Sequence, residues 1–492
     1  LTVTDDVSVG GDAAVTGALT GGTVNGVGIS YNISNFSNGL LISSDASTGT
    51  LSSASNNTGI GTSVFAALTT GDQNTIVGSL AGDVLTTGTD NTGFGFGALS
   101  ALTTANDNTA VGASALVNNS TGASNTAVGR AALIANTTAS NNIAVGSSSL
   151  AANTTGDRNV AVGTNALDAN TTADANVAIG HQALSANTTA ESNTAIGFNA
   201  MLSNTTGANN VAIGSTALDA NTTASNNTGI GFAALGANTT GGDNVAIGMD
   251  CMKVNTTGTA NVAIGKAALD ANTTANSNVA IGKLSLTANT TGAGNTGVGA
   301  ETLESNTTGT QNTAVGFQAA EQNTTASNVT AVGHHALTDN TTGAENAAFG
   351  SFALENNTTG GSNTACGHNA MAANTTASFN TAMGKNSMEA NTTGANNTAV
   401  GRESLASNTT ASNNTAIGFN AMLVNTTGAG NVAVGATALD ANTTGANLVA
   451  IGSAALSANT TANNNTAIGA AALLVNTTGT ENVAIGVQAL DA

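Results

Sequence analysis

Four histidines are the residues best suited to acid–base chemistry or metal binding. His334 and His335 are adjacent, whereas His181 and His368 stand apart. Two imidazoles can bind a transition metal when their ring nitrogens converge on one point. Because adjacent residues of a strand point to opposite faces, the sequence favours a solvated pair over a metal site. We therefore assign no catalytic, cofactor-binding or metal-binding residue, and we do not expect an enzyme.

Carboxylates and thiols offer little more chemistry. Cys251 and Cys366 are 115 residues apart, too far in a repeat chain for a mutual disulfide, so we expect two free, buried thiols. Several aspartates recur at one position of a 17-residue unit, but the Gly-Gly-x-Gly-x-Asp pattern of calcium-binding β-rolls is missing. We interpret these aspartates as surface charge: Asp168, Asp219, Asp270 and Asp440.

Asparagine has the most regular spacing of all polar residues, and Asn-x-Ser/Thr is the acceptor sequence for N-linked glycans. Such a sequon begins in each successive unit from Asn119, through Asn136 and Asn153, to Asn476, which makes 22 possible sites. A turn rich in Asn and Thr creates sequons automatically, so a structural origin is favoured. A glycosylated extracellular filament protein is the alternative.

Composition limits the kind of protein that these residues can belong to. The 492 residues include 61 Gly, no Pro, no Trp, one Tyr and 11 Phe, which cannot fill a thick core. The net charge is −20 with only seven Lys and Arg, and this disfavours nucleic acid as a partner. No apolar run of about 18 residues is present, so membrane insertion is not expected.

A 17-residue repeat organises most of the chain. One glycine follows each Asn-Thr/Val-Ala-Ile/Val segment, 26 times without insertion or deletion. Numbering the unit from Asn210 (position 1) to Asn226 (position 17) places this glycine at position 5, where we expect a tight turn with positive φ. Representative turn glycines are Gly61, Gly163, Gly180, Gly214, Gly265 and Gly486.

A unit of this length is too short for two packed helices and fits one coil with two short strands and two turns. The sequence therefore predicts an all-β protein, a parallel β-solenoid (β-roll) of 17-residue coils. We expect 26 repeats over residues 57–492, preceded by an irregular β-rich neck over residues 1–56.

Alternation along the Asn-Val-Ala-Ile segment assigns its side chains to two faces. We expect the larger residues, at positions 2 and 4, to point into the coil, as core-strand residues Ile179, Ile213 and Ile264. We expect leucine at position 9 to fill the same interior, with Leu167, Leu184 and Leu269 as examples. Alanine at positions 3 and 8 is expected at a contact between chains. Positions 6, 7, 10, 16 and 17 vary freely and should face solvent.

Asparagine at positions 1 and 12 predicts two ladders along the solenoid. Amides stacked about 4.8 Å apart can bond to one another from coil to coil. The ladder residues that we single out are Asn159 and Asn176 at position 1, and Asn170 and Asn187 at position 12.

The units resemble the head repeats of trimeric autotransporter adhesins, in which Asn-x-x-Ala-Ile-Gly-x-x-Ala builds a left-handed parallel β-roll in a homotrimer. Asn-Thr-Ala-Ile-Gly-Phe-Asn-Ala, at residues 193–200 and 414–421, is similar to repeats of phage tail-fibre proteins that carry a C-terminal self-cleaving chaperone. The opening residues 1–11 are similar to tail-fibre segments as well. The resemblance implies a left-handed, homotrimeric fibre and does not choose between phage and cell.

These features favour a structural shaft of an extracellular fibre, either a virion tail fibre or an adhesin at the bacterial surface. The expected partners are further copies of the chain, a tip or chaperone segment beyond Ala492, and a host-surface receptor or glycan. A second interpretation makes the variable positions 6, 7 and 10 an adhesive stripe that binds glycans or surfaces itself.

Overall fold

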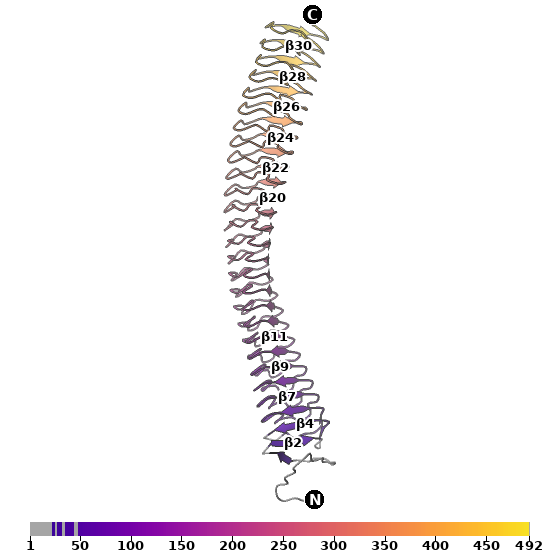
Figure 1. Ribbon diagram of the computed structural model, residues 1–492, viewed down its shortest axis with the longest axis vertical. Helices are drawn as coiled ribbons and strands as arrows, with labels where there is room; N and C mark the ends of the chain where they lie inside the picture. Colours follow the sequence, from indigo (N-terminus) through magenta and orange to yellow (C-terminus); the bar gives the residue numbers. More distant parts are fainter. Residues whose placement is uncertain (1–21, 25–26, 32–34, 44–47, 492) are drawn as a thin grey trace, which may run out of the picture. The chain divides into compact units, whose positions relative to one another are not determined.

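The computed structural model describes residues 22–24, 27–31, 35–43 and 48–491. Within these residues the chain forms short strands and turns, and no helix. Accordingly, this described part offers no helix that could cross a membrane. The chain divides into two compact units, Leu1–Thr223 and Ala224–Ala492. Each unit is a parallel β-solenoid built from stacked coils, as the two halves of Figure 1 show.

The first unit contains fifteen described strands. They are β1 (Gly22–Val24), β2 (Val27–Tyr31), β3 (Phe36–Ser37), β4 (Leu40–Ser43), β5 (Ala54–Ser55), β6 (Thr58–Ile60), β7 (Thr75–Val77), β8 (Thr92–Phe94), β9 (Thr109–Val111), β10 (Thr126–Val128), β11 (Ile143–Val145), β12 (Val160–Val162), β13 (Val177–Ile179), β14 (Thr194–Ile196) and β15 (Val211–Ile213).

The second unit contains sixteen described strands. They are β16 (Thr228–Ile230), β17 (Val245–Ile247), β18 (Val262–Ile264), β19 (Val279–Ile281), β20 (Thr296–Val298), β21 (Thr313–Val315), β22 (Thr330–Val332), β23 (Ala347–Phe349), β24 (Thr364–Cys366), β25 (Thr381–Met383), β26 (Thr398–Val400), β27 (Thr415–Ile417), β28 (Val432–Val434), β29 (Val449–Ile451), β30 (Thr466–Ile468) and β31 (Val483–Ile485).

Strand pairing confirms the predicted parallel β-solenoid of 17-residue coils. From β6 onward within the first unit, and throughout the second, each strand pairs in parallel with the equivalent strand of the next coil. Ala161 lies opposite Ala178, for example, and Ala246 lies opposite Ala263. Each regular coil contains one three-residue strand rather than the two that we expected, because positions 6 to 11 are occupied by turns.

The segment before residue 57, which we predicted as a separate neck, lies partly outside the described residues. Its described part contains antiparallel pairs between β1 and β2 and between β2 and β4. Strand β4 then pairs in parallel with β6, with Leu40 opposite Thr58. Coil stacking therefore begins before residue 57, in a coil one residue longer than the regular unit.

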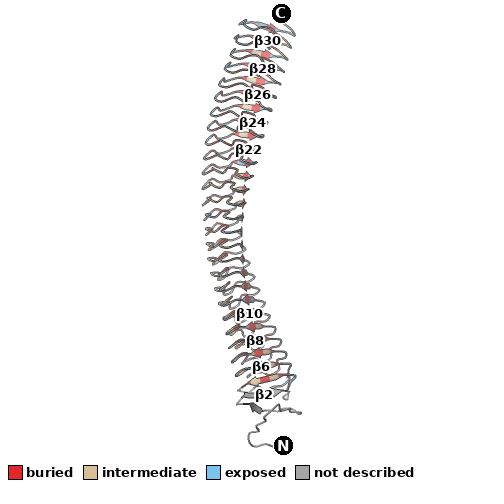
Figure 2. Cartoon of the chain, in the orientation of Figure 1, coloured by how far each residue is buried: buried red, intermediate tan, exposed pale blue. Residues whose placement is uncertain are grey.

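The interior of each coil is narrow and lined by small side chains. The middle residue of the strand, at position 3, points inward, and Ala161, Ala178 and Ala212 are fully buried there. Buried and partly exposed residues alternate along the strands in Figure 2. Alanine at position 8 and leucine at position 9 complete this interior. The prediction that Leu167, Leu184 and Leu269 lie in the core is confirmed, since all three are fully buried.

The prediction that the strand isoleucines form the core is wrong. Ile179, Ile213 and Ile264 point outward and are 38%, 37% and 36% exposed. Alternation correctly placed positions 2 and 4 on one face, but that face is the outer one. Alanine at positions 3 and 8 consequently lies inside its own coil and not at a contact between chains. A coil this narrow has room for alanine opposite leucine but not for a row of isoleucines.

Backbone conformation explains the strict glycine at position 5. The six singled-out glycines Gly61, Gly163, Gly180, Gly214, Gly265 and Gly486 have φ between +129° and +141°, where L-residues with a side chain are strongly strained. Positions 7, 9 and 17 adopt the left-handed conformation as well, but with φ near +55°, as at Gln182, Leu184 and Ala175. A buried leucine or methionine is held in this conformation in most coils.

Candidate functional site

Two asparagine ladders run through each unit at positions 1 and 12, as predicted. At position 1, the backbone N–H of Asn176 donates to Oδ1 of Asn159 at 2.9 Å. At position 12, Nδ2 of Asn187 donates to Oδ1 of Asn170 at 3.1 Å. All four side chains are fully buried. The ladders therefore supply hydrogen bonds inside the coil that its few apolar residues cannot replace.

The two ladders meet at the carbonyl of position 15. The Ala173 carbonyl accepts from Nδ2 of Asn159 at 2.9 Å and from Nδ2 of Asn170 at 3.1 Å, both in its own 17-residue unit. Threonine at position 13 adds a third ladder, since the Thr171 hydroxyl donates to the Thr188 carbonyl at 3.1 Å. Each coil is thus bonded to the next through backbone and side chains together.

Most of the predicted sequons begin at position-12 asparagines that are buried, so they cannot carry glycans in the folded chain. Asn119, Asn136 and Asn153 are fully buried, and Nδ2 of Asn136 donates to Oδ1 of Asn119 at 2.9 Å. A glycan attaches through this same nitrogen, so the folded coil cannot carry one there. Asn476, in the last complete turn, is only partly buried, but its Nδ2 still donates to the Gly479 carbonyl at 2.9 Å.

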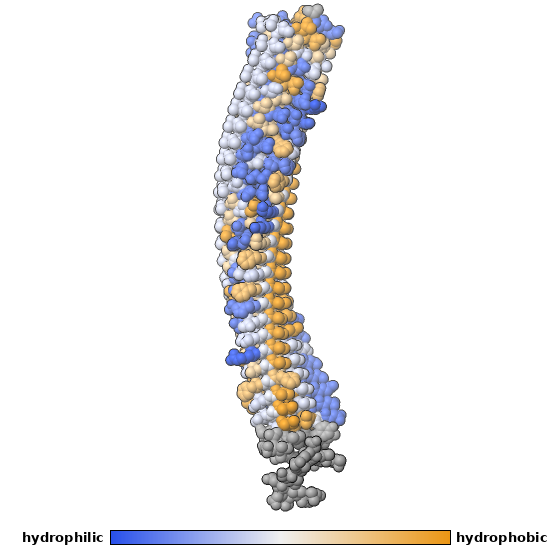
Figure 3. All heavy atoms as spheres, viewed as in Figure 1, coloured by the Kyte–Doolittle hydropathy of each residue, from blue (hydrophilic) through white to orange (hydrophobic). Residues whose placement is uncertain are grey.

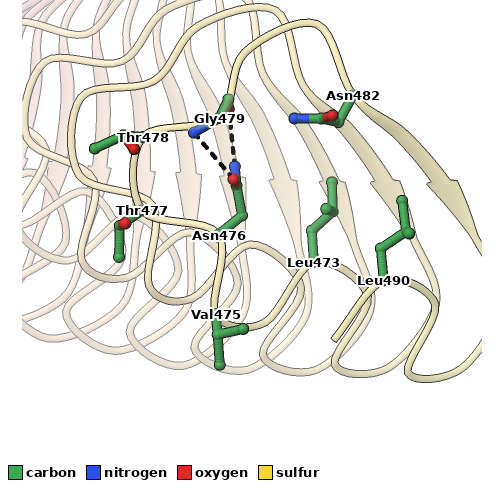
Figure 4. A pocket seen from close by; sticks show the side chains of 8 residues that line it. All are labelled: Leu473, Val475, Asn476, Thr477, Thr478, Gly479, Asn482 and Leu490. Atoms are coloured by element: carbon green, nitrogen blue, oxygen red, sulfur yellow. Dashed lines mark hydrogen bonds between the residues drawn. The ribbon is translucent and has the colours of Figure 1, made fainter. Parts of the chain in front are cut away.

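A hollow of about 370 Å³ lies beside Asn476, where the final described coil is not covered by another (Figure 4). Two of its lining residues, Leu473 and Asn482, occupy core and ladder positions that are covered in preceding coils. Asn476 is engaged with Gly479 on both its side-chain atoms, accepting from the Gly479 N–H at 3.1 Å. The hollow is therefore the shape of an uncovered coil face and presents no reactive group.

An outward-facing surface follows the strands of each unit, with an apolar residue at position 4 of each coil and Thr or an apolar residue at position 2. We call it the strand stripe and define it as positions 2 and 4 of β6–β15 in the first unit and of β16–β31 in the second. A band of apolar residues follows successive coils in Figure 3. Its most exposed position-4 members in the first unit are Ile60, Phe94, Val111, Val128, Val145, Ile179 and Ile213. In the second unit they are Ile264, Ile281, Val315, Phe349, Met383, Ile417, Ile451, Ile468 and Ile485.

The two cysteines occupy different environments. Cys251, at position 8, is buried, and burial raises the pKa of its thiol to about 12. Cys366, at position 4, is exposed on the strand stripe between Phe349 and Met383 of the adjoining coils. The expectation of two buried thiols is therefore confirmed for Cys251 and wrong for Cys366.

The histidine pair does not point to opposite faces. The ring centroids of His334 and His335 are 4.2 Å apart, because these residues lie in a turn and His335 has φ of +55°. Phe317 and Phe352, in the coils before and after, pack against both imidazoles. Sequence reasoning missed this cluster, although aligning the units would have shown aromatic residues at positions 6 and 7 of consecutive coils.

Three acidic side chains, Glu301, Glu304 and Glu321, interact with one another in the coil of Phe317 and the coil before it. Burial, together with repulsion from Glu301 and Glu321, raises the pKa of Glu304. Burial also raises the pKa of Glu321, again with repulsion from Glu301. Of the recurring aspartates, Asp168 accepts a hydrogen bond from the Ser185 hydroxyl in the next coil. Among the described residues, no group of three or more His, Cys, Asp and Glu side chains is placed to hold a metal ion.

In comparisons with known proteins, no protein-family model matches this chain, and no curated protein matches it at a significant level.

Proposed function

We propose that this chain is the structural shaft of an extracellular fibre, in which three copies associate along the strand stripe. The observation that carries the proposal is the stripe itself, because it places large apolar side chains outside every coil. Contiguous exposed apolar patches larger than roughly 300–600 Å² are uncommon on monomers and mark interaction surfaces.

The periodicity of the stripe favours another copy of the same chain as its partner. Positions 2 and 4 recur in every coil of both units, in register from strand to strand. Only a partner with the same axial repeat can meet this pattern in every coil, and a second copy has that repeat. The resemblance to trimeric adhesin heads and tail fibres supports three copies and an extracellular location, on a virion or a bacterial surface.

The coil interior supports a structural role. Each coil is bonded to the next by the strand ladder and by the side chains of Asn and Thr. Most buried side chains of the two ladders are used in these bonds between coils, as at Asn170 and Asn187. A receptor-binding tip or a chaperone segment beyond Ala492 fits this role as a partner.

Sedimentation equilibrium tests the association. We expect a mass three times the 47.0 kDa of one chain. A triple variant, Val145→Thr, Ile179→Thr and Ile213→Thr, should weaken association, because it makes three exposed stripe positions polar while keeping β-branched side chains. A monomeric mass for the natural chain over the whole concentration range would contradict the proposal.

Exposed threonines elsewhere on the same coils provide the matched control. Thr155, Thr172 and Thr189 occupy position 14, outside the strand stripe, and their side chains are exposed. Replacing all three by serine alters the surface of the same part of the first unit. This control should sediment like the natural chain.

A further inference from the structure

Five ring side chains form a ladder on the turns of four consecutive coils in the second unit. We call Phe317, His334, His335, Phe352 and His368 the aromatic ladder. The Phe317 and His334 rings are stacked with centroids 5.6 Å apart and planes 24° apart. His335 and Phe352 follow at 5.7 Å, and Phe352 and His368 at 5.8 Å. The rings therefore form one continuous row.

The coil geometry creates this row. All five residues occupy position 6 or 7, directly after the turn glycine. His335 and Phe352, at position 7, have φ of +55° and +60°, which brings a position-7 side chain beside a position-6 side chain. Since successive coils are about 4.8 Å apart, the ladder extends about 14 Å over three coil steps.

The ladder is exposed and is not required by the fold. Phe317 is 43% exposed, and His334 and His368 are exposed. Other coils carry serine at the same two positions, as Ser147 and Ser148 do. An interface between copies in register would recur in every coil, as the strand stripe does, whereas this row covers four coils and a shorter stack, His181 on Phe198 at 5.5 Å, covers two coils of the first unit. Its side chains therefore serve a local purpose.

Carboxylates and carboxamides outnumber the two lysines around the ladder, Lys283, which pairs with Glu301 at 3.7 Å, and Lys385 in the coil after His368. Gln318 Nε2 donates to Glu301 Oε2 at 3.0 Å, and Gln322 Nε2 donates to Glu321 Oε1 at 3.2 Å. Asp339, two positions beyond Leu337 in the His334 coil, is exposed. This acidic surrounding opposes phosphate, nucleic acid and other anions.

We infer that the aromatic ladder and its flanking carboxylates and amides bind a neutral carbohydrate chain. The exposed parts of these rings can remove the apolar C–H surface of sugar residues from water. Carboxylates accept strong hydrogen bonds from the hydroxyl groups at the sugar edge. A row of rings about 14 Å long suits an extended oligosaccharide lying along successive coils. The inference does not rest on the shaft proposal, because the ladder and its flanking groups lie within one chain.

The test is binding of the full chain to an array of neutral oligosaccharides, followed by saturation-transfer NMR with the sugar that binds. The ladder variant is Phe317→Ser with Phe352→Ser, which introduces a residue that other coils accommodate at these positions. The control is Phe96→Ser with Phe232→Ser, two exposed position-6 phenylalanines outside the ladder. Circular dichroism and sedimentation verify that all three proteins keep their fold and copy number.

We expect the natural chain and the control to bind the same sugar, and the ladder variant to bind it at least about tenfold more weakly. The absence of binding to any neutral sugar on the array would overturn the inference, as would equal binding by the ladder variant. Binding of oligolysine in place of sugars would also overturn it and assign the rings to a cation. Since copy number is measured separately by sedimentation, none of these binding results decides whether the shaft proposal is right.

Discussion

Gly163 lies against the carbonyl group of Gly180 in the next coil so closely that a Cβ on Gly163 would overlap that carbonyl oxygen. The same relationship holds between Gly180 and Gly197. Two independent constraints, a positive φ and this close approach, therefore act on position 5 of each of these coils. Together they explain why the glycine recurs without exception along the repeat.

Replacing Gly180 by alanine should destabilise its coil. Backbone strain at φ of +138° contributes about 1–3 kcal/mol, and the contact with Gly197 adds to it. Hydrogen exchange of the surrounding coils is the suitable measurement, since long repeat arrays do not unfold in one step. Gly156→Ala is the control: a Cβ there also approaches a carbonyl, yet Ala139 and Ala173 occupy this position in adjoining coils. Equal protection in both variants would contradict the explanation.

Asn176→Ala should cost more stability than Asn176→Val. Either change removes the acceptor of the Asn193 N–H, now bonded at 2.9 Å, and such a loss costs about 1–3 kcal/mol when the group stays buried. Valine at least fills the space, as Val329 does at position 1 of its own coil, where it is 1% exposed. Denaturant unfolding and exchange of the Asn193 amide measure the difference. If the Asn193 amide exchanges no faster in either variant than in the natural chain, this ladder bond contributes little to stability.

Thiol labelling should distinguish the two cysteines. With its pKa raised to about 12 by burial, Cys251 carries almost no thiolate near neutral pH and should react only after unfolding. Cys366 is exposed on the strand stripe, so it should react in the native chain, and more slowly as protein concentration rises and copies cover the stripe. Cys366→Ser should abolish native labelling. A rate independent of concentration would place the association surface elsewhere.

Acidification should stabilise the second unit around Glu321. Its pKa is raised in the folded chain, mainly by burial, so the folded state binds protons more tightly than the unfolded state. Stability therefore falls as pH rises through the raised pKa and stays lower above it. Thermal unfolding between about pH 4 and pH 7 should show this slope, and Glu321→Gln should flatten it. Glu191→Gln, in the first unit, makes the same charge change and should leave the slope of the second unit intact.

The solenoid and its ladders were predictable because they depend on periodicity alone. A strict 17-residue step predicts which residues stack, and hence that Asn159 bonds to Asn176 and that Leu167 repeats a core position. Strand alternation separates Ala178 from Ile179 but does not say which of them faces inward. The usual preference for large apolar residues inside gave the wrong answer, because the narrow interior is already filled by leucine and asparagine.

The aromatic ladder could not be derived from strand rules. The expectation that His334 and His335 diverge assumed an extended backbone, whereas His335 adopts a left-handed conformation. Position 7 adopts positive φ with a non-glycine residue in nearly every coil. The sequence does not reveal this conformation, because Asn, Gln, Thr, Ser and His all occur there. The clustering of rings depends on this turn.

The uninterrupted register has a consequence for how such a chain can change during evolution. Gain or loss of one whole unit joins equivalent positions, so Asn meets Asn and glycine meets glycine across the new junction. Gain or loss of a single residue would displace both amide ladders at once. The fold therefore accommodates a change in length by whole coils, each adding about 4.8 Å to a sheet, without disturbing the ladders of the other coils.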